Sequence, residues 1–316
     1  MEKIVVSAPA TIANIGPGFD VYGLAVDSPV DIIKAKKLED NPKKVIISKT
    51  NLPELPLEAD QNTAGIAAQF VLNKVNADFG VEFKLEKGMG IGTGLGSSAA
   101  SAAAGVKAVA HFLNNDVENL ESILLEGCIV AEEAIDGGIH GDNVAPSLFG
   151  GFIVIPSSRN PLLYTKFVLP KTLRVILATP PISILTADAR RIIPKEIPLQ
   201  HSIYSTGYAG LVMAGIIKKD LKLMGQGIVD TIIEPVRAGL IPHFYKVKQA
   251  ALDAGAYGCS ISGAGPTVFA IADENSDVKN IGKAMAEAFE MHKQVTVRIG
   301  LPNNDGAKVL ARSFHF

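Results

Sequence analysis

A glycine-rich stretch that ends in two serines is the part of the sequence best suited to chemistry. Residues 88–105 read GMGIGTGLGSSAASAAAG, with Ser97 and Ser98 between the glycines and the alanines. The alternating residues 81–87 before it predict a strand, and the alanines after it predict a helix. Glycines let backbone N–H groups approach an anion, and the first turn of a helix leaves N–H groups unpaired. The stretch predicts a phosphate-binding loop; the alternative is a flexible linker or a tight turn.

Neither of the two common nucleotide motifs fits this loop. A P-loop has lysine followed by serine or threonine after its glycines, and no lysine occurs between Gly88 and Gly105. A dinucleotide fingerprint would need a third glycine at position 97, where the chain has Ser97. The pattern therefore predicts a phosphate site of a third kind.

Acidic residues gather in a second glycine-bearing stretch, AEEAIDGGIHGDN. A magnesium ion beside a triphosphate takes a few oxygen ligands from the protein. Glu132 or Glu133 could supply a carboxylate, and Ser97 or Ser98 could supply a hydroxyl. The alternative is that the acids form the solvated end of a helix, although a carboxylate is unfavourable near a helix C-terminus. His140, in the same stretch, could be structural or functional.

Other candidates lie further away along the chain. Asn14 and Asp20 stand in an apolar, glycine-bearing segment, which predicts either a ligand loop or a buried turn. Arg190 lies on a helix expected to start near Thr186, and Arg237 is expected in a fixed loop because it stands between two prolines. SGAGP at 262–266 predicts a tight hairpin, or a backbone packed against a ligand or the first glycine loop.

The composition sets the class of protein. The chain has 316 residues with 47% hydrophobic and 20% charged residues, which is typical of a globular protein. A net charge of −2 and the absence of a basic block argue against a nucleic-acid partner. We expect no membrane span, because no run of 18 apolar residues occurs. Two isolated cysteines and the absence of a signal peptide predict a cytoplasmic protein.

The length suggests two domains, which we place at residues 1–157 and 158–316. The polar segment SSRNP at 157–161 is the predicted boundary. We expect a ligand loop over residues 7–26 and paired strands over 30–37 and 43–49. Helices are expected over 60–76, 99–110, 117–134, 204–224, 225–233, 243–254 and 276–289.

Three glycine-rich segments in this order resemble the GHMP kinases, over residues 3 to about 300. The segments are residues 9–23, GLGSSAA at 94–100 and SGAGP at 262–266. The resemblance implies an α+β fold of two domains: an N-terminal nucleotide domain with a mixed sheet and a ferredoxin-like C-terminal domain. It also implies ATP and Mg²⁺ as cofactors, a small alcohol as phosphoryl acceptor, and a homodimer.

Within this superfamily the chain is most similar to the homoserine kinases. PATIANIGPGFD at 9–20, HGDNVAPSLFGG at 140–151 and EPVR at 234–237 carry this resemblance, together with the threonine and arginine of LTADAR. It implies phosphorylation of the side-chain hydroxyl of L-homoserine in threonine biosynthesis. Asp20 would then take the ammonium, and Arg190 and Arg237 the carboxylate, since a guanidinium matches it in bidentate fashion. Asn14 and His140 could hydrogen-bond the substrate.

The resemblance also assigns the nucleotide and metal residues. Ser98 and Glu132 would bind Mg²⁺, while Ser97 and Glu133 stay open as alternatives. One departure is Gly90, which stands where the family usually has proline and leaves the start of the loop freer. The residues expected at the nucleotide are Asn62, Gly90, Ile91, Gly92, Thr93, Gly94, Leu95, Gly96, Ser97, Ser98, Ala99 and Ala100.

Asn143 is the expected catalytic residue. Mevalonate kinases and galactokinases resemble one another in having an aspartate seven residues before a Gly-Gly pair, and here that position is Asn143. An asparagine cannot accept a proton at neutral pH. We therefore hypothesise that no side-chain base operates, that Asn143 orients the hydroxyl, and that the proton passes to a phosphate oxygen.

Two other readings of the sequence stay open. The first is a kinase of the same superfamily for another small alcohol, such as mevalonate or shikimate; Asp20 argues against mevalonate, which has no ammonium. The second is a non-catalytic protein that senses a nucleotide or a metabolite. The intact glycine loop and the presence of both candidate metal ligands argue against this second reading. Turnover with a panel of alcohols separates the three readings.

Overall fold

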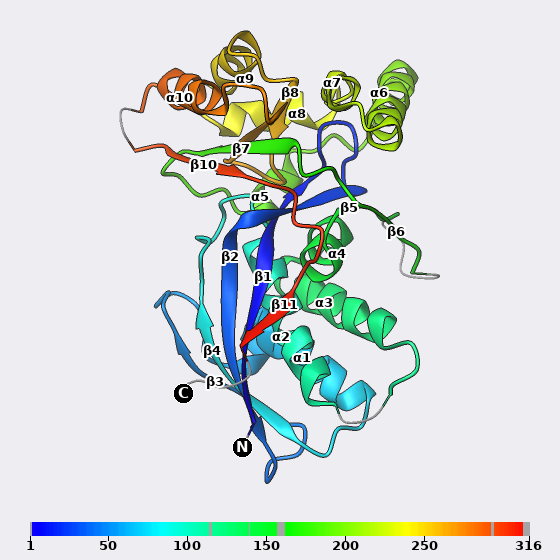
Figure 1. The fold of residues 1–316 in the computed structure, drawn as a ribbon, viewed down its shortest axis with the longest axis vertical. Helices are drawn as coiled ribbons and strands as arrows, with labels where there is room; N and C mark the ends of the chain where they lie inside the picture. The colour runs from blue at the N-terminus through cyan, green and yellow to red at the C-terminus, as the bar shows by residue number, and fades with distance from the viewer. Residues whose placement is uncertain (1, 114–115, 139, 157–161, 292–293, 312–316) are drawn as a thin grey trace.

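The computed structural model describes the chain except for residues 1, 114–115, 139, 157–161, 292–293 and 312–316. Figure 1 shows an N-terminal region built on a long sheet with helices against one face, and a C-terminal region with its own sheet above it. The segment 157–161, predicted as the domain boundary, lies outside the described residues. No described helix is long and apolar enough to cross a membrane.

The first sheet is mixed, because one of its strand pairs is parallel. Its strands follow the order β11-β1-β2-β4-β3, and β5 pairs with β2 and with β6. β3 pairs in parallel with β4, so the prediction that the strand segments 30–37 and 43–49 pair with each other is wrong. The strands are β1 (Lys3–Ala13), β2 (Tyr22–Leu38), β3 (Val45–Thr50), β4 (Gly80–Glu86), β5 (Phe152–Val154), β6 (Thr165–Phe167) and β11 (Lys308–Ala311).

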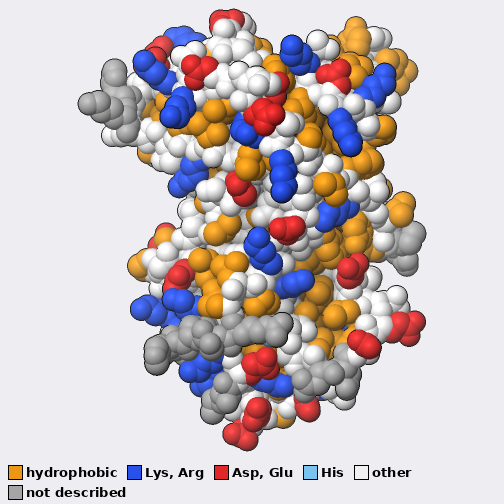
Figure 2. Space-filling model, viewed as in Figure 1, with side chains coloured by type: hydrophobic (Ala, Val, Ile, Leu, Met, Phe, Trp, Pro, Cys, Tyr) orange, Lys and Arg blue, Asp and Glu red, His pale blue; other side chains and the backbone are white. Residues whose placement is uncertain are grey.

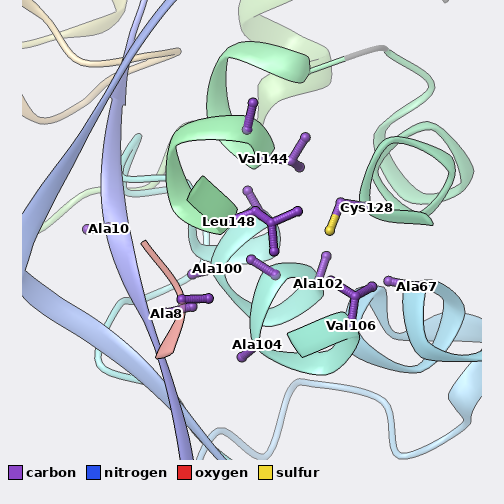
Figure 3. Packing of buried hydrophobic residues seen from close by; sticks show 14 of the residues in the cluster. Ala8, Ala10, Ala67, Ala100, Ala102, Ala104, Val106, Cys128, Val144 and Leu148 are labelled. Atoms are coloured by element: carbon purple, nitrogen blue, oxygen red, sulfur yellow. The ribbon is translucent and has the colours of Figure 1, made fainter. Parts of the chain in front are cut away.

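Four helices cover one face of this sheet: α1 (Thr63–Lys74), α2 (Ser97–Phe112), α3 (Leu120–Asp136) and α4 (Gly141–Phe149). α2 is the central helix, and Figure 3 shows its alanines packed among β1, α1, α3 and α4. Residues 99–106 of α2 are all buried. A helix that is apolar all round belongs in the interior, and its small side chains let its neighbours approach closely. The glycine loop is thereby attached to a helix whose residues 99–106 are all in the core of the domain.

The second sheet is antiparallel in the order β10-β7-β9-β8. Its strands are β7 (Leu173–Thr179), β8 (Gly258–Ile261), β9 (Val268–Asp273) and β10 (Thr296–Gly300). The helices of this region are α5 (Thr186–Arg191), α6 (Leu199–Lys218), α7 (Leu221–Gln226), α8 (Ile233–Arg237), α9 (Phe244–Asp253) and α10 (Val278–Ala288). One hydrophobic cluster joins both sheets: it runs from Ile4 and Phe83 to Leu173, Met224 and Phe269.

Three predicted segments differ from the structure, and so does the loop predicted at Arg237, which is the last residue of the helix α8. The expected ligand loop 7–26 is mostly strand, because β1 continues to Ala13 and β2 begins at Tyr22, so that only residues 14–21 form a loop. The expected helix 225–233 is absent: α7 ends at Gln226 and α8 begins at Ile233. The expected helix 204–224 is divided, because Lys219 takes a left-handed conformation (φ 57°) and ends α6. Asp220 then caps α7 by accepting a hydrogen bond from Leu223 N–H.

Candidate active site

A cavity of about 390 Å³ lies where the three glycine-rich segments meet. Its lining comes from the loop 14–21, the central loop 90–96, the start of α2, the end of α3, α5, Arg237 and Gly263. Segments from both regions of the chain therefore form one site. The hairpin turn 262–266 packs against the central loop, since the Ser262 hydroxyl donates to the Gly94 carbonyl at 2.6 Å.

The carbonyl groups of the central loop are held one after another. Ser183 Oγ donates to Ile91 O at 3.0 Å, and the Ile184 N–H donates to Gly92 O at 3.0 Å. Thr267 Oγ1 donates to Thr93 O at 2.7 Å. The C-terminal region thus fixes the loop that follows Gly90, at the point where the family proline is missing.

Two glycines of the loop are required by their surroundings. Gly94 has φ 76°, and a Cβ there would lie 2.5 Å from the Ser262 carbonyl oxygen. Gly96 has φ 66°, and a Cβ there would lie 2.1 Å from Thr11 Oγ1 and 3.0 Å from Asn143 Oδ1. A side chain is disfavoured at both positions for conformation and for space. Gly96 is also the N-cap of α2 and offers no side-chain cap, so the first N–H groups of α2 are free for an anion in the cavity.

A buried ion pair lies beneath this loop. Lys87 Nζ pairs with Asp31, and it also donates to the Ser97 carbonyl and the Ser101 hydroxyl, both at 2.6 Å. The Gly88 N–H donates to the other oxygen of Asp31 at 3.0 Å. Asp31 therefore fastens the start of the loop to the first turn of α2. Burial lowers the pKa of Lys87, while Asp31 and then Glu132 oppose that change, which places this cation near the Glu132 carboxylate.

The residues predicted as alternative metal ligands differ in burial and in hydrogen bonding. Glu132 is buried and lines the cavity, whereas Glu133 is exposed and does not. Both serines line the cavity, but the Ser97 hydroxyl donates to the Met89 carbonyl at 3.3 Å. Ser98 and Glu132 are thus a hydroxyl and a carboxylate facing one space, and oxygen ligands of this kind suit Mg²⁺.

A second group of ligand-type atoms belongs to Asp20, His140 and Asp142, which lie within 4.8 Å of one another. Arg190 already faces this group, with its two terminal nitrogens each 3.0 Å from an oxygen of Asp20. A guanidinium in that position repels a metal cation. The arrangement suits an organic ligand that carries both charges better than it suits a metal ion.

Arg190 and Arg237 reach the cavity from different elements. Both lie over the Phe19 ring, at 5.6 Å and 5.1 Å from its centroid. Arg237 is buried and donates from Nη1 to the Gly263 carbonyl at 2.8 Å. The Nε atom of Arg190 is buried and has no hydrogen-bond partner among the described residues. An unpaired buried donor costs free energy, so an acceptor on a ligand would relieve it.

The loop 14–21 is held in an unusual conformation. Asn14, Ile15 and Asp20 all have positive φ, which is rare for residues other than glycine and especially for a β-branched one. Asn14 donates to the Gly263 carbonyl at 2.9 Å and accepts from the Asp20 N–H at 3.1 Å. These bonds fix the Asp20 carboxylate towards the cavity.

Asn143 stands between two polar neighbours. Its Oδ1 accepts from the Thr11 hydroxyl at 2.9 Å, and its Nδ2 lies 3.4 Å from Asp142 Oδ1. Burial raises the pKa of Asp142 to about 7; Asp20 adds to this rise and Arg190 opposes it. The first turn of α4 therefore presents an oriented amide beside a carboxyl that titrates near neutral pH.

Most of the predicted site residues line this one cavity. Asn14, Asp20, His140, Asn143, Arg190 and Arg237 do so, as do Asn62, Ile91, Gly92, Thr93, Gly94, Gly96, Ser97, Ser98 and Glu132. The structure does not bring Gly90, Leu95, Ala99 and Ala100 to the lining. Leu95, Ala99 and Ala100 are buried in the core, and Gly90 is exposed.

Sequence reasoning missed Lys87, Asp31 and Thr11. Lys87 gave a signal, because it is the last residue of the predicted strand before the first glycine. Thr11 and Asp31 gave none, since each lies inside a strand and meets the site only through strand pairing. Asn62 lines the cavity, and its side chain also caps α1 by accepting from the Ala64 N–H at 3.1 Å; its role at the nucleotide stays a prediction.

Comparison with known proteins identifies the family. The family model of the GHMP kinases N terminal domain matches residues 62–151, and that of the GHMP kinases C terminal matches residues 212–290. Homoserine kinase of Pyrococcus furiosus is 39% identical over 285 residues, which cover 90% of this chain and 92% of that protein. The crystal structure of homoserine kinase from Cytophaga hutchinsonii has a TM-score of 0.91 at 40% identity and covers 98% of each chain.

A more distant likeness shows the fold alone. The crystal structure of Lactococcus lactis galactokinase in complex with galactose has a TM-score of 0.72 at 16% identity, over 98% of this chain and 95% of that one. The two family models, the similarity over most of the chain and the shared arrangement of loops agree. This chain belongs to the GHMP kinases and, within them, to the homoserine kinase family.

Proposed function

We propose that the protein is a cytoplasmic, ATP-dependent kinase of L-homoserine that forms O-phospho-L-homoserine for threonine biosynthesis. The observation that carries the proposal is the two-sided cavity. A helix N-terminus and a glycine loop line one side, and Asp20, Arg190 and Arg237 line the other. The first side suits a triphosphate, and the second suits an amino acid with both of its charges.

The nucleotide side uses backbone groups and one metal site. The N–H groups at the start of α2 would hold phosphate oxygens, and Asn62 with Ile91 would lie near the base. Ser98 and Glu132 would hold Mg²⁺, which screens the charge of the phosphates. Lys87 is already saturated by Asp31, Ser97 and Ser101, so its part is to fix the loop and to balance Glu132.

The substrate side uses groups of opposite charge. Asp20 would accept hydrogen bonds from the ammonium of homoserine. Arg190 would take the carboxylate through its unpaired Nε edge, and Arg237 would add a second positive charge. Mevalonate lacks the ammonium, so the Asp20 carboxylate would then be buried without a cation of the substrate.

The hydroxyl of the substrate would lie at Asn143. Thr11 fixes Asn143 Oδ1, so its Nδ2 is oriented and could donate to the reacting oxygen. No side-chain base is required, because the loose transition state of phosphoryl transfer lets the proton leave late to a phosphate oxygen. We expect Asn143→Ala to lose most of its kcat, whereas Asp142→Asn keeps a nearly normal kcat. The reverse pattern would contradict this role.

Turnover tests the proposal directly. ADP release is measured with Mg·ATP and, separately, L-homoserine, mevalonate, shikimate and galactose. We expect release with homoserine and little with the others. Preference for mevalonate or shikimate would assign another kinase of the superfamily, and no turnover with any of them would support a sensor.

We also propose that the protein forms a homodimer through the outer face of α6. Leu199, Ile203 and Ile217 are exposed there, and no charged residue occurs between positions 199 and 217. Gly207 and Gly210 lie on the same face, and a Cβ on either would contact nothing within 4 Å. Figure 2 shows apolar side chains gathered at the upper right, where α6 lies in Figure 1.

The spacing of this face suits a second copy of itself. Ile203, Gly207, Gly210, Ala214 and Ile217 follow one another at intervals of 4, 3, 4 and 3, with large residues at both ends and small ones between. An antiparallel copy of α6 that crosses at Gly210 would place Ile203 of one copy beside Ile217 of the other, and the small residues between them would let the two helices approach closely, as in a two-fold interface. Gly210→Arg should give a monomer by sedimentation velocity. Tyr245→Arg, at an exposed site on α9, is the control and should stay dimeric.

A further inference from the structure

A second buried carboxyl lies beside the one expected to bind the ammonium. Asp142 is 1% exposed, and its carboxyl lies within 4.8 Å of ligand atoms of Asp20 and His140. Arg190 gives its two terminal nitrogens to Asp20 at 3.0 Å. Asp142 receives a longer contact, from Asn143 Nδ2 at 3.4 Å. Arg190 thus bonds directly to one carboxyl of the pair, and it acts on Asp142 only through space, where it opposes the effect of burial in part.

The protonation of Asp142 follows from this asymmetry. Burial raises its pKa to about 7, so close to half of the free protein carries a proton there at pH 7. The charged and titratable groups that face it are Asp20 on the loop, His140 at the start of α4, Arg190 on α5 and Arg237 on α8. A new cation between Asp20 and Asp142 would favour the ionised form.

We propose that Asp142 is a second acceptor for the ammonium of the substrate, and that substrate binding ionises it and releases its proton to water. This inference rests on the proposed function. One carboxyl O–H bond breaks, the proton goes to solvent, and the carboxylate left behind accepts a hydrogen bond from the ammonium. The net charge of the bound complex falls by one relative to the protonated free site.

The geometry suits a bridging ammonium. Two hydrogen bonds of about 2.8 Å at a tetrahedral angle reach oxygens roughly 4.6 Å apart, and the ligand atoms of Asp20 and Asp142 lie within 4.8 Å. Asp20 is already engaged at both oxygens by Arg190. A second acceptor therefore lets the ammonium use more than one of its three donors, and an alcohol without an ammonium gains nothing from it.

Calorimetry measures the released proton. L-Homoserine is titrated into the enzyme in phosphate and in imidazole, whose ionisation enthalpies differ, at pH 6, 7 and 8. Linkage predicts a release near one proton at pH 6, about half at pH 7 and close to none at pH 8. The homoserine Kd should fall about tenfold from pH 6 to pH 8.

Three controls separate the possible outcomes. Asp142→Asn should bind homoserine with no proton release and a Kd nearly independent of pH over this range. Asp188→Asn, at an exposed ion pair on the same helix as Arg190, should behave as the wild type. 4-Hydroxybutanoate, which lacks the ammonium, should release no proton from the wild type.

Two results would overturn the inference. One is homoserine binding that shows the same heat in both buffers at pH 6 and pH 7. The other is a release that persists in Asp142→Asn, which would assign the proton to a neighbour such as His140. If the protein neither binds nor phosphorylates homoserine at any pH, that result contradicts the proposed function itself. Failure of the inference and failure of the proposed function can therefore be distinguished.

Discussion

At the scale of single residues, the substrate side of the cavity holds opposite charges in contact before any substrate is present. Asp20 and Arg190 form a two-point ion pair, and both remain partly exposed. A zwitterion can insert its own two charges without leaving either partner uncompensated, whereas a singly charged ligand cannot. This is a physical reason for selecting an amino acid over a simple hydroxy acid.

Asp20→Asn should raise the homoserine KM by about 10- to 100-fold, since a hydrogen bond to a charged group contributes about 1.5–3 kcal/mol. The KM for ATP should change little, because Asp20 lies on the opposite side of the cavity. Steady-state kinetics with each substrate varied in turn gives both constants. An equal rise in the KM for homoserine and the KM for ATP would indicate that Asp20 maintains the conformation of the loop 14–21 and does not bind the substrate.

Asp142 should make the free protein less stable as the pH rises. Its pKa in the folded chain is about 7 against an ordinary value of 3.8, so the folded state binds more protons between those values. Stability contributed by the protonated form is therefore lost from pH 4 to pH 7, by at most about 4 kcal/mol. Asp142→Asn should raise the Tm more at pH 8 than at pH 5. An equal change at both pH values would contradict the titration.

At the scale of elements, α8 shows how a very short helix can hold a functional side chain. Asp230 caps it by accepting from the N–H groups of Ile232, Ile233 and Glu234, each at 2.8 Å. Glu234 in turn accepts from Lys248 at 2.5 Å and from Ser260 at 2.6 Å. A five-residue helix is not stable alone, so these bonds are what place Arg237.

Asp230→Ala should lower the free energy of unfolding by about 1–2 kcal/mol and raise the homoserine KM several-fold. Asp277→Ala is the matched control, because Asp277 caps α10 in the same way, by accepting from the Asn280 N–H at 3.0 Å. It should lose similar stability and keep its KM. Urea unfolding and steady-state kinetics report the two quantities, and a raised KM in both variants would show that lost stability alone is the cause.

The sequence predicted local features better than pairings. The strand, glycine loop and helix around Ser97 follow from periodicity and composition, and the structure confirms them. The parallel pairing of β3 with β4 could not be predicted, because residues 51–79 separate the two strands and no local pattern records their partner. The extension of β1 to Ala13 was hidden by Pro9, which usually interrupts a strand.

For the site, too, local features could be predicted from the sequence and contacts between distant segments could not. Residue type and spacing pointed to Glu132 or Glu133 and to Ser97 or Ser98 as metal ligands, but they could not tell that Glu133 is exposed or that the Ser97 hydroxyl bonds to the Met89 carbonyl. The position of Lys87 before the first glycine was visible in the sequence, but its ion pair with Asp31, a residue of β2, was not. Contacts between distant segments are set by tertiary packing, and a single sequence does not contain them explicitly.

At the scale of the whole molecule, the two regions share a continuous hydrophobic cluster. Residues of β1 and α2 belong to it together with Leu173, Met224 and Phe269 of the C-terminal region. The hairpin turn 262–266 also bonds to the central loop and to the loop 14–21. The site therefore exists only when both regions are folded and docked.

Urea unfolding should show one transition, because so much apolar surface is shared that neither region is expected to persist without the other. Circular dichroism at 222 nm and tyrosine fluorescence should give the same midpoint, and Mg·ATP should move both together. Two separated midpoints would show that the regions unfold independently. Gly94→Ala should lower the common midpoint, since its Cβ would clash with the Ser262 carbonyl.

The pairing of β11 with β1 bears on how the chain is made. Val5 pairs with Ala311 and Ser7 with Lys308, so β1 must wait for a segment that is translated some 300 residues later. Until then one edge of β1 is open, and an open strand edge can pair with another chain. We expect nascent chains stalled before β11 to depend on a chaperone at that edge.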